Sequence, residues 1–222
     1  MSNPLQLKER LAEAARYALL RRLAPALRHN MAGSLQPVNM MSAMLEKRLQ
    51  NPVPDLPALA KNSATLNTLS RGAAASCMAL MAWFAPNDHE QVVFDICLEH
   101  ALGLVNTELS FKGLMVINET AGVKAQLPRS VVCNVVMTAL IAMADVAVAP
   151  SNMVLTAEQR GDELLITIAV VATQGETMSG SMTRYRGLQW DDVQALAEAD
   201  SVHLTRSATQ TELRYRLVTT FV

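Results

Sequence analysis

The sequence has no excess of charge of either sign and few aromatic residues. Lys and Arg number 19, Asp and Glu number 20, and the formal net charge is -1. A protein that binds nucleic acid through its phosphates needs a basic patch or a basic excess. Single-strand binding also uses stacked aromatic rings, and aromatic residues make up only 4% of this chain. The composition therefore argues against nucleic acid as a partner.

The chain is also poor in residues arranged to bind metal or to form disulfides. Its three cysteines, Cys77, Cys97 and Cys133, are far apart in the sequence and form no CxxC pair. An odd number of cysteines without a framework spacing favours a reducing compartment, with the thiols buried in helices. The four histidines are scattered, and none stands at metal-ligand spacing from another His or Cys. We therefore expect no metal site.

Long apolar runs are missing as well. No window approaches the roughly 20 apolar residues that span a bilayer, and the first residues carry charges spread through them, unlike a signal peptide. We therefore expect a soluble, cytoplasmic protein without a membrane partner.

Half of the residues are hydrophobic, and the first part of the chain arranges them with helical periodicity. From about Leu5 to Gln50, apolar positions recur at alternating spacings of four and three residues, the heptad pattern of bundled helices. Pro25 and Pro37 lie inside this segment and each removes a backbone donor, so we expect a kink or irregularity on either side of His29. The positions that recur at this spacing form a seam along one side of the helix, which consists of Leu20, Ala24, Leu27, Met31, Ser34, Val38, Met41 and Leu45.

A second helix with a matching seam follows a proline-rich turn. The turn runs from Asn51 to Pro57, and the helix is predicted from about Ala58 to Phe84. Two long helices joined by a short turn form an antiparallel hairpin, whose core buries little on its own. Pairing two hairpins in a homodimer gives a four-helix bundle that covers the remaining apolar surface. The second seam consists of Leu59, Asn62, Leu66, Leu69, Ala73, Ser76, Leu80 and Trp83.

The segment Ala85 to Asp88 breaks the second helix, and the remaining chain alternates short helices and strands. This order predicts an α+β fold, a sandwich with helices on one face of a mixed sheet. The expected domains are a helical hairpin, residues 1–86, and an α/β sandwich, residues 87–222. The predicted helices are 91–109, 129–148 and 191–200, and the predicted strands are 113–119, 153–157, 163–172, 202–207 and 212–218.

The order of these parts resembles a histidine kinase transmitter. The stretch from His29 to Pro37, HNMAGSLQP, is similar to the box that carries the phosphoacceptor histidine on a dimerisation hairpin. Asn134 to Met143 is similar to the asparagine box of the kinase ATPase domain, and Gly187-Leu188 resembles its second glycine box. The closing ELRYRLV resembles the last strand of that domain. The resemblance covers nearly the whole chain and implies a phosphotransfer hairpin followed by a kinase-type ATPase domain.

The residues that would bind nucleotide in this family differ here. The resemblance places the family's magnesium-holding asparagine at Thr138, and its adenine-binding aspartate after the strand that ends near Ala172, where the chain reads ATQG. The Thr138 hydroxyl does not replace the amide oxygen of an asparagine as a metal ligand. The Ala172 methyl group does not replace a carboxylate as the acceptor for adenine. The phosphate-binding GxG loop is absent too. We therefore expect a degenerate ATPase-like domain that binds no ATP and no other cofactor.

His29 is the candidate catalytic residue. Leu27 and Met31 occupy seam positions on either side, so His29 falls on the outer face of its helix. A neutral imidazole nitrogen is nucleophilic near neutral pH. Asn30 follows where the family has an acidic residue. The resemblance makes His29 a phosphoacceptor, whereas the spacing alone favours a plain surface histidine.

The resemblance also implies the partners. We expect response-regulator receiver domains, which bring their own aspartate and magnesium, to dock around His29. Ala32 and Gly33 lie one turn further on and leave room for docking, and Arg28 and Gln36 complete the predicted partner-binding residues. The predicted function is a histidine phosphotransferase that relays phosphoryl groups between receivers.

Other interpretations remain open. In one, the chain is a non-catalytic interaction module that binds a response regulator or another histidine kinase, and His29 is not phosphorylated. In another, it is an autokinase with an unusual nucleotide site. The remaining histidines are weaker candidates: His89 is expected at a helix start, His100 on a solvated helix face and His203 on an edge strand.

Overall fold

A computed structural model describes residues 4–83, 90–174 and 187–217. The chain divides into two compact units, which we call the α/β unit, Met1–Leu23 with Pro86–Val222, and the hairpin unit, Ala24–Ala85. Compared with the expected division into 1–86 and 87–222, the N-terminal residues up to Leu23 cluster with the second part. The predicted break at Ala85 to Asp88, and His89 beside it, lie outside the described residues.

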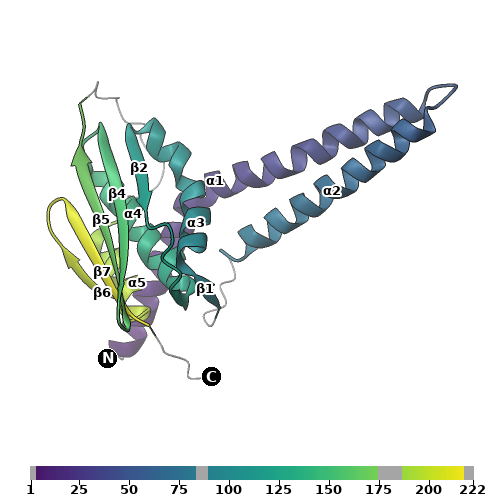
Figure 1. Cartoon of the computed structure of the whole chain (residues 1–222). Helices are drawn as coiled ribbons and strands as arrows, with labels where there is room; N and C mark the ends of the chain where they lie inside the picture. The colour runs from purple at the N-terminus through teal and green to yellow at the C-terminus, as the bar shows by residue number, and fades with distance from the viewer. Residues whose placement is uncertain (1–3, 84–89, 175–186, 218–222) are drawn as a thin grey trace. The chain divides into compact units, whose positions relative to one another are not determined.

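Two long helices form the hairpin. α1 (Pro4–Leu49) passes through both units, and α2 (Leu56–Met81) runs antiparallel to its second half (Figure 1). Asp55 caps α2, because its carboxylate accepts a hydrogen bond from the backbone N–H of Ala58 at 3.0 Å. The two predicted helices and the turn between them are confirmed, with ends shifted by one to three residues.

The hairpin unit buries its predicted seams only in part. Leu27, Asn62, Ala73 and Leu80 are buried, whereas most of the other seam residues are half-buried. Ala24 is exposed, so its assignment to the seam was wrong. Before Ala24, the buried face of α1 contains Leu19 and Leu23. The half-buried seam residues are Met31, Ser34, Val38, Met41, Leu45, Leu59, Leu66, Leu69, Ser76 and Trp83.

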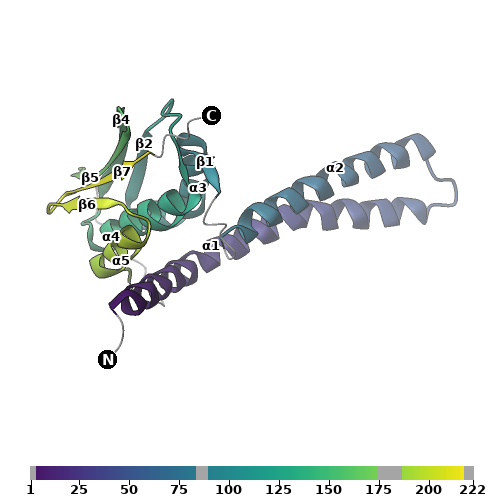
Figure 2. The same cartoon turned by 90° about the horizontal axis from the view of Figure 1, so that it is seen from below.

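The α/β unit contains a five-stranded mixed sheet with the strand order β2-β4-β5-β7-β6. β2 and β4 are parallel, and every other neighbouring pair is antiparallel. Three helices cover one face of the sheet, and the first half of α1 lies on their far side (Figure 2). This confirms the predicted α+β fold. The strands are β2 (Leu114–Glu119), β4 (Ser151–Arg160), β5 (Glu163–Ala172), β6 (His203–Arg206) and β7 (Gln210–Arg216), and the helices are α3 (Phe94–Phe111), α4 (Met137–Val146) and α5 (Trp190–Ala199).

Two local features were not predicted. β1 (Gln91–Val93) pairs antiparallel with β3 (Gln126–Pro128), so α3 begins at Phe94 rather than at Gln91. The backbone N–H of Phe94 donates to the carbonyl of Ala125 at 2.9 Å, which anchors the start of this helix to the ribbon. The second feature is η1 (Val131–Val136), a π-helical stretch that runs directly into α4. Single-turn π segments of this kind are frequent at functional sites.

An ionic cluster ties α1 to the helices of the α/β unit. The guanidinium of Arg22, whose side chain is only 6% exposed, pairs with Glu108 of α3 and with Asp145 of α4, the latter at 3.2 Å. Lys112 reaches the same Asp145 oxygen at 2.7 Å. The backbone N–H of Leu188 also points at this carboxylate, at 3.4 Å. Two cations and two carboxylates therefore balance one another in a largely buried place.

Candidate functional site

His29 lies in the hairpin unit, on the exposed face of α1. Leu27, two residues before it, is 1% exposed, and Met31, two residues after it, is half-buried. A step of two residues in an α-helix turns the side chain by about 200°, so His29 points away from the α2 side and is exposed. This agrees with the exposed position expected from the seam spacing.

The four predicted partner-binding residues are exposed around it. Ala32, Gly33 and Gln36 stand three, four and seven residues after His29, which places them on the same face of α1. Arg28 is exposed beside the histidine. A Cβ atom added at Gly33 would meet nothing within 4 Å. The surface next to the imidazole is therefore low and open, as a docking face requires.

The helical backbone around His29 has fewer hydrogen bonds than a regular helix. α1 continues through Pro25 and Pro37 without a break. Because proline has no N–H, neither Pro25 nor Pro37 donates a helical hydrogen bond to the residue four positions earlier. The Ser34 hydroxyl donates to the Asn30 carbonyl at 2.9 Å instead of reaching outward.

The other histidines lie elsewhere. His100 is exposed on α3, and His203 begins the edge strand β6, as predicted. His89 is outside the described residues. In the amino-acid sequence, His29 is the single histidine between Ala24 and Ala85.

The positions expected to match the kinase nucleotide site are buried or uncharged. Thr138 is fully buried, and its hydroxyl has no hydrogen-bond partner among the described residues. Ala172 and Thr173, at the end of β5, are exposed but uncharged, and the Thr173 N–H donates to the Pro150 carbonyl at 3.0 Å. Among the described residues, these positions therefore carry no carboxylate, and the Thr138 hydroxyl is buried away from solvent.

Two clusters of side chains were not predicted from the sequence. One is the ionic cluster, of which only the Glu108–Lys112 spacing of four residues on one helix was visible in the sequence. The other is the pair Cys97 and Cys133, whose sulfur atoms lie 4.0 Å apart in the α/β unit. Within the part of the chain that the structure describes, no three His, Cys, Asp or Glu side chains converge as metal ligands. Across the same residues, no helix combines the length and apolarity of a membrane span.

No family model and no curated protein matches the sequence. Solved structures do show similarity. A histidine kinase of Acinetobacter baumannii, AdeS, is 14% identical with a TM-score of 0.44, over 82% of this chain and 96% of that chain. A histidine kinase from Burkholderia phymatum is 15% identical with a TM-score of 0.43, over 88% of this chain and 97% of that chain. A bacterial phosphotransferase is 16% identical with a TM-score of 0.38, over 88% and 94%.

These identities and TM-scores are low, so the functional proposals below rest on the residues of this chain. Its elements follow in the order of a long helical hairpin, a mixed sheet and helices on one face of that sheet. In its fold and in the order of its parts, the chain resembles a histidine kinase transmitter.

Proposed function

We propose that this protein is a histidine phosphotransferase of two-component signalling. It accepts a phosphoryl group on His29 from the aspartate of one receiver domain and passes the group to the aspartate of another. The observation that carries this proposal is the exposed imidazole on the outer face of α1, next to the open surface at Gly33. A phosphoacceptor has to be reachable in this way, because the rest of the active site belongs to the partner.

The proposed transfer requires this chain to supply only a nucleophile in the correct position. A neutral ring nitrogen of His29 attacks the phosphorus, the N–P bond forms, and the P–O bond to the aspartate breaks so that the carboxylate leaves. The return step is the reverse on a second receiver. Docking converts each transfer into a reaction within one complex, which is where most of the rate is gained. The neutral Asn30 fits this role, because an aspartyl phosphate is already a reactive donor.

The docking surface follows from the same geometry. We assign Arg28, Ala32, Gly33 and Gln36 to receiver contacts, because they are exposed around His29. In this proposal residues 1–86 serve dimerisation and phosphotransfer, and residues 87–222 add a docking surface without ATPase activity. Receivers are cytoplasmic partners, so we place the protein in the cytoplasm.

The chain should not bind ATP. Thr138 is buried where a metal ligand would be needed, and the end of β5 carries no acid within the described residues. Titration calorimetry of the full chain with magnesium–ATP should give no saturable heat. Saturable binding at micromolar concentration would contradict this expectation and favour an autokinase.

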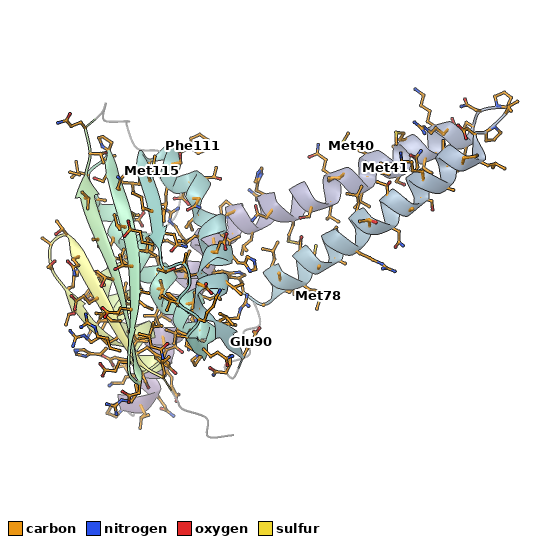
Figure 3. All side chains as sticks on the ribbon, viewed as in Figure 1. Met40, Met41, Met78, Glu90, Phe111 and Met115 are labelled. Atoms are coloured by element: carbon orange, nitrogen blue, oxygen red, sulfur yellow. The ribbon has the colours of Figure 1, made fainter. Side chains whose placement is uncertain are left out.

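The protein should be a homodimer through the hairpin unit. Met31, Val38, Met41 and Leu66 of the seams remain half-buried in one hairpin. Met78 projects from the outer face of α2 (Figure 3) and is 72% exposed. A second hairpin would remove this apolar surface from water. Light scattering at micromolar concentration should give twice the mass of the chain, and a monomer would count against the bundle.

The proposed function is tested by transfer from labelled receivers. Candidate receivers carrying a labelled aspartyl phosphate are incubated with the full chain, and the chain is then separated from them. The expected product is label on this protein that is stable in alkali and labile in acid, as a phosphohistidine is. If no receiver transfers label, yet a receiver still binds, the protein is an interaction module and the phosphotransfer proposal fails.

A further inference from the structure

Two cysteines that are distant in the sequence meet in the core of the α/β unit. Cys97 on α3 and Cys133 on η1 place their sulfur atoms 4.0 Å apart. Both are free thiols, 7% and 6% exposed. No motif joins them, and neither has a part in phosphotransfer on His29. The pair therefore needs an explanation of its own.

The two sulfur atoms are neighbours but are not bonded. A disulfide holds its sulfur atoms about 2.0 Å apart, so the two sulfurs must approach by roughly half of their present separation. Cys133 belongs to the π-helical stretch Val131–Val136. Such a stretch closes its hydrogen bonds over five residues where an α-helix closes them over four, so Cys133 lies outside regular α-helix. Cys97 can complete the approach by rotating about its side-chain bonds.

The surroundings make the two thiols unequal. The hydrogen bond from Cys133 lowers the pKa of the Cys97 thiol, and the positive charge of Arg129 lowers it further, against burial and the charge of Glu90. The same hydrogen bond, together with burial, raises the pKa of Cys133. Arg129 lies 3.7 Å from the Glu90 carboxylate, and its buried Nε–H has no hydrogen-bond partner among the described residues. Figure 3 labels Glu90. A thiolate is the reactive form of cysteine, so the lowered pKa favours Cys97 as the attacking thiol.

We propose that Cys97 and Cys133 form a reversible redox pair that a hydroperoxide oxidises to an intramolecular disulfide. The Cys97 thiolate attacks one oxygen of the hydroperoxide, the O–O bond breaks, and the alcohol or water leaves with a proton from solvent. This gives a sulfenic acid at Cys97. The Cys133 sulfur then attacks the Cys97 sulfur, the S–S bond forms and water leaves. Two thiols lose two electrons to the peroxide, and a dithiol reductant restores them by exchange.

The disulfide would join α3 to η1 across the core of the α/β unit. Cys97 and Cys133 are both buried there, so the bond restrains the unfolded chain while the fold needs only a local adjustment. The oxidised protein is therefore more resistant to denaturant than the reduced one. This inference is independent of the proposed phosphotransfer, because it concerns neither His29 nor the hairpin unit.

The test uses the full chain with Cys77 replaced. Cys77 is half-buried on α2, and it is the only other cysteine in the sequence. In Cys77→Ser, a disulfide within one chain can join only Cys97 and Cys133. The reduced variant is treated with hydrogen peroxide, then denatured and weighed by mass spectrometry without reductant. We expect a mass lower by two hydrogen atoms, no free thiol, and recovery of both thiols with dithiothreitol.

Matched variants separate the steps. In Cys77→Ser with Cys133→Ser, the sulfenic acid at Cys97 should persist and react with dimedone. In Cys77→Ser with Cys97→Ser, Cys133 should stay a free thiol at the same peroxide concentration. Wild-type protein gives a measurement without any substitution, because its free thiols should fall from three to one. Two unreacted thiols in Cys77→Ser, addition of oxygen without a disulfide, or bonds between chains would each overturn the proposal.

Discussion

His29→Ala should lose all transfer of label from phosphorylated receivers and keep its fold. The substitution removes the nucleophile that forms the N–P bond, and no neighbouring side chain of α1 offers a replacement ring nitrogen. The position is exposed, so the free energy of unfolding should change by no more than about 0.5 kcal/mol. The measurement is label on the chain after incubation with receiver, together with urea unfolding and light scattering.

A second histidine serves as the matched control. His100 is also an exposed helical histidine, on α3, so His100→Ala changes the same chemical group outside the hairpin. Its transfer should equal that of the wild type. Label that persists on His29→Ala would mean that another residue accepts the phosphoryl group. Equal losses in both variants would mean that histidine substitution harms the protein in general.

Gly33 tests the docking surface apart from the chemistry. Gly33→Arg puts a long side chain one turn from the imidazole and should reduce receiver binding and transfer together. Gly33→Ala is the control, because the added Cβ has no atom within 4 Å. Alanine also favours the helix by about 1 kcal/mol over glycine. Normal transfer by Gly33→Arg would show that the receiver does not approach over this surface.

The hairpin could be predicted well because its signal is local and repeated. Apolar spacing of four and three residues over many turns predicts two long helices, and the prolines after Asn51 predict the turn between them, although α2 already begins at Leu56. The exposure of His29 followed from the same seam, since Leu27 and Met31 fix which side of α1 faces α2. Ala24 was assigned wrongly because the period alone does not show that the buried face shifts to Leu23 as α1 enters the α/β unit.

The features that sequence reasoning missed depend on partners far along the chain. The β1–β3 ribbon joins Val92 to Leu127, and three-residue strands leave too short a period to recognise. The Cys97–Cys133 pair exists only because α3 packs against η1. The very apolar stretch from Arg129 onward predicted a buried helix, but its π-helical part has no counterpart in composition or period. Residues that are brought together only by tertiary packing cannot be recognised as a site from the sequence pattern.

Asp145→Ala should destabilise the α/β unit more than any exposed charge change. The carboxylate is 13% exposed and accepts from Lys112 at 2.7 Å and from Arg22 at 3.2 Å. Its removal leaves two cations with the single carboxylate of Glu108. Breaking a buried ion pair by deleting one partner costs about 3–5 kcal/mol, because the remaining charge is buried without compensation. Urea unfolding followed by circular dichroism should show a loss of this size.

Two matched variants show whether charge or packing causes the loss. Asp145→Asn keeps an oxygen that can accept from Lys112 but removes the charge, so its loss should be smaller than that of alanine and still measurable. Glu158→Ala breaks an exposed ion pair with Arg160, at 2.7 Å, whose side chains are more than half exposed; it should cost less than about 1 kcal/mol. If Asp145→Ala costs no more than Glu158→Ala, the cluster does not hold α1 in the α/β unit. If Asp145→Ala shows the large loss, and Asp145→Asn a smaller loss that still exceeds that of Glu158→Ala, the stability is assigned to the buried charge that binds Arg22.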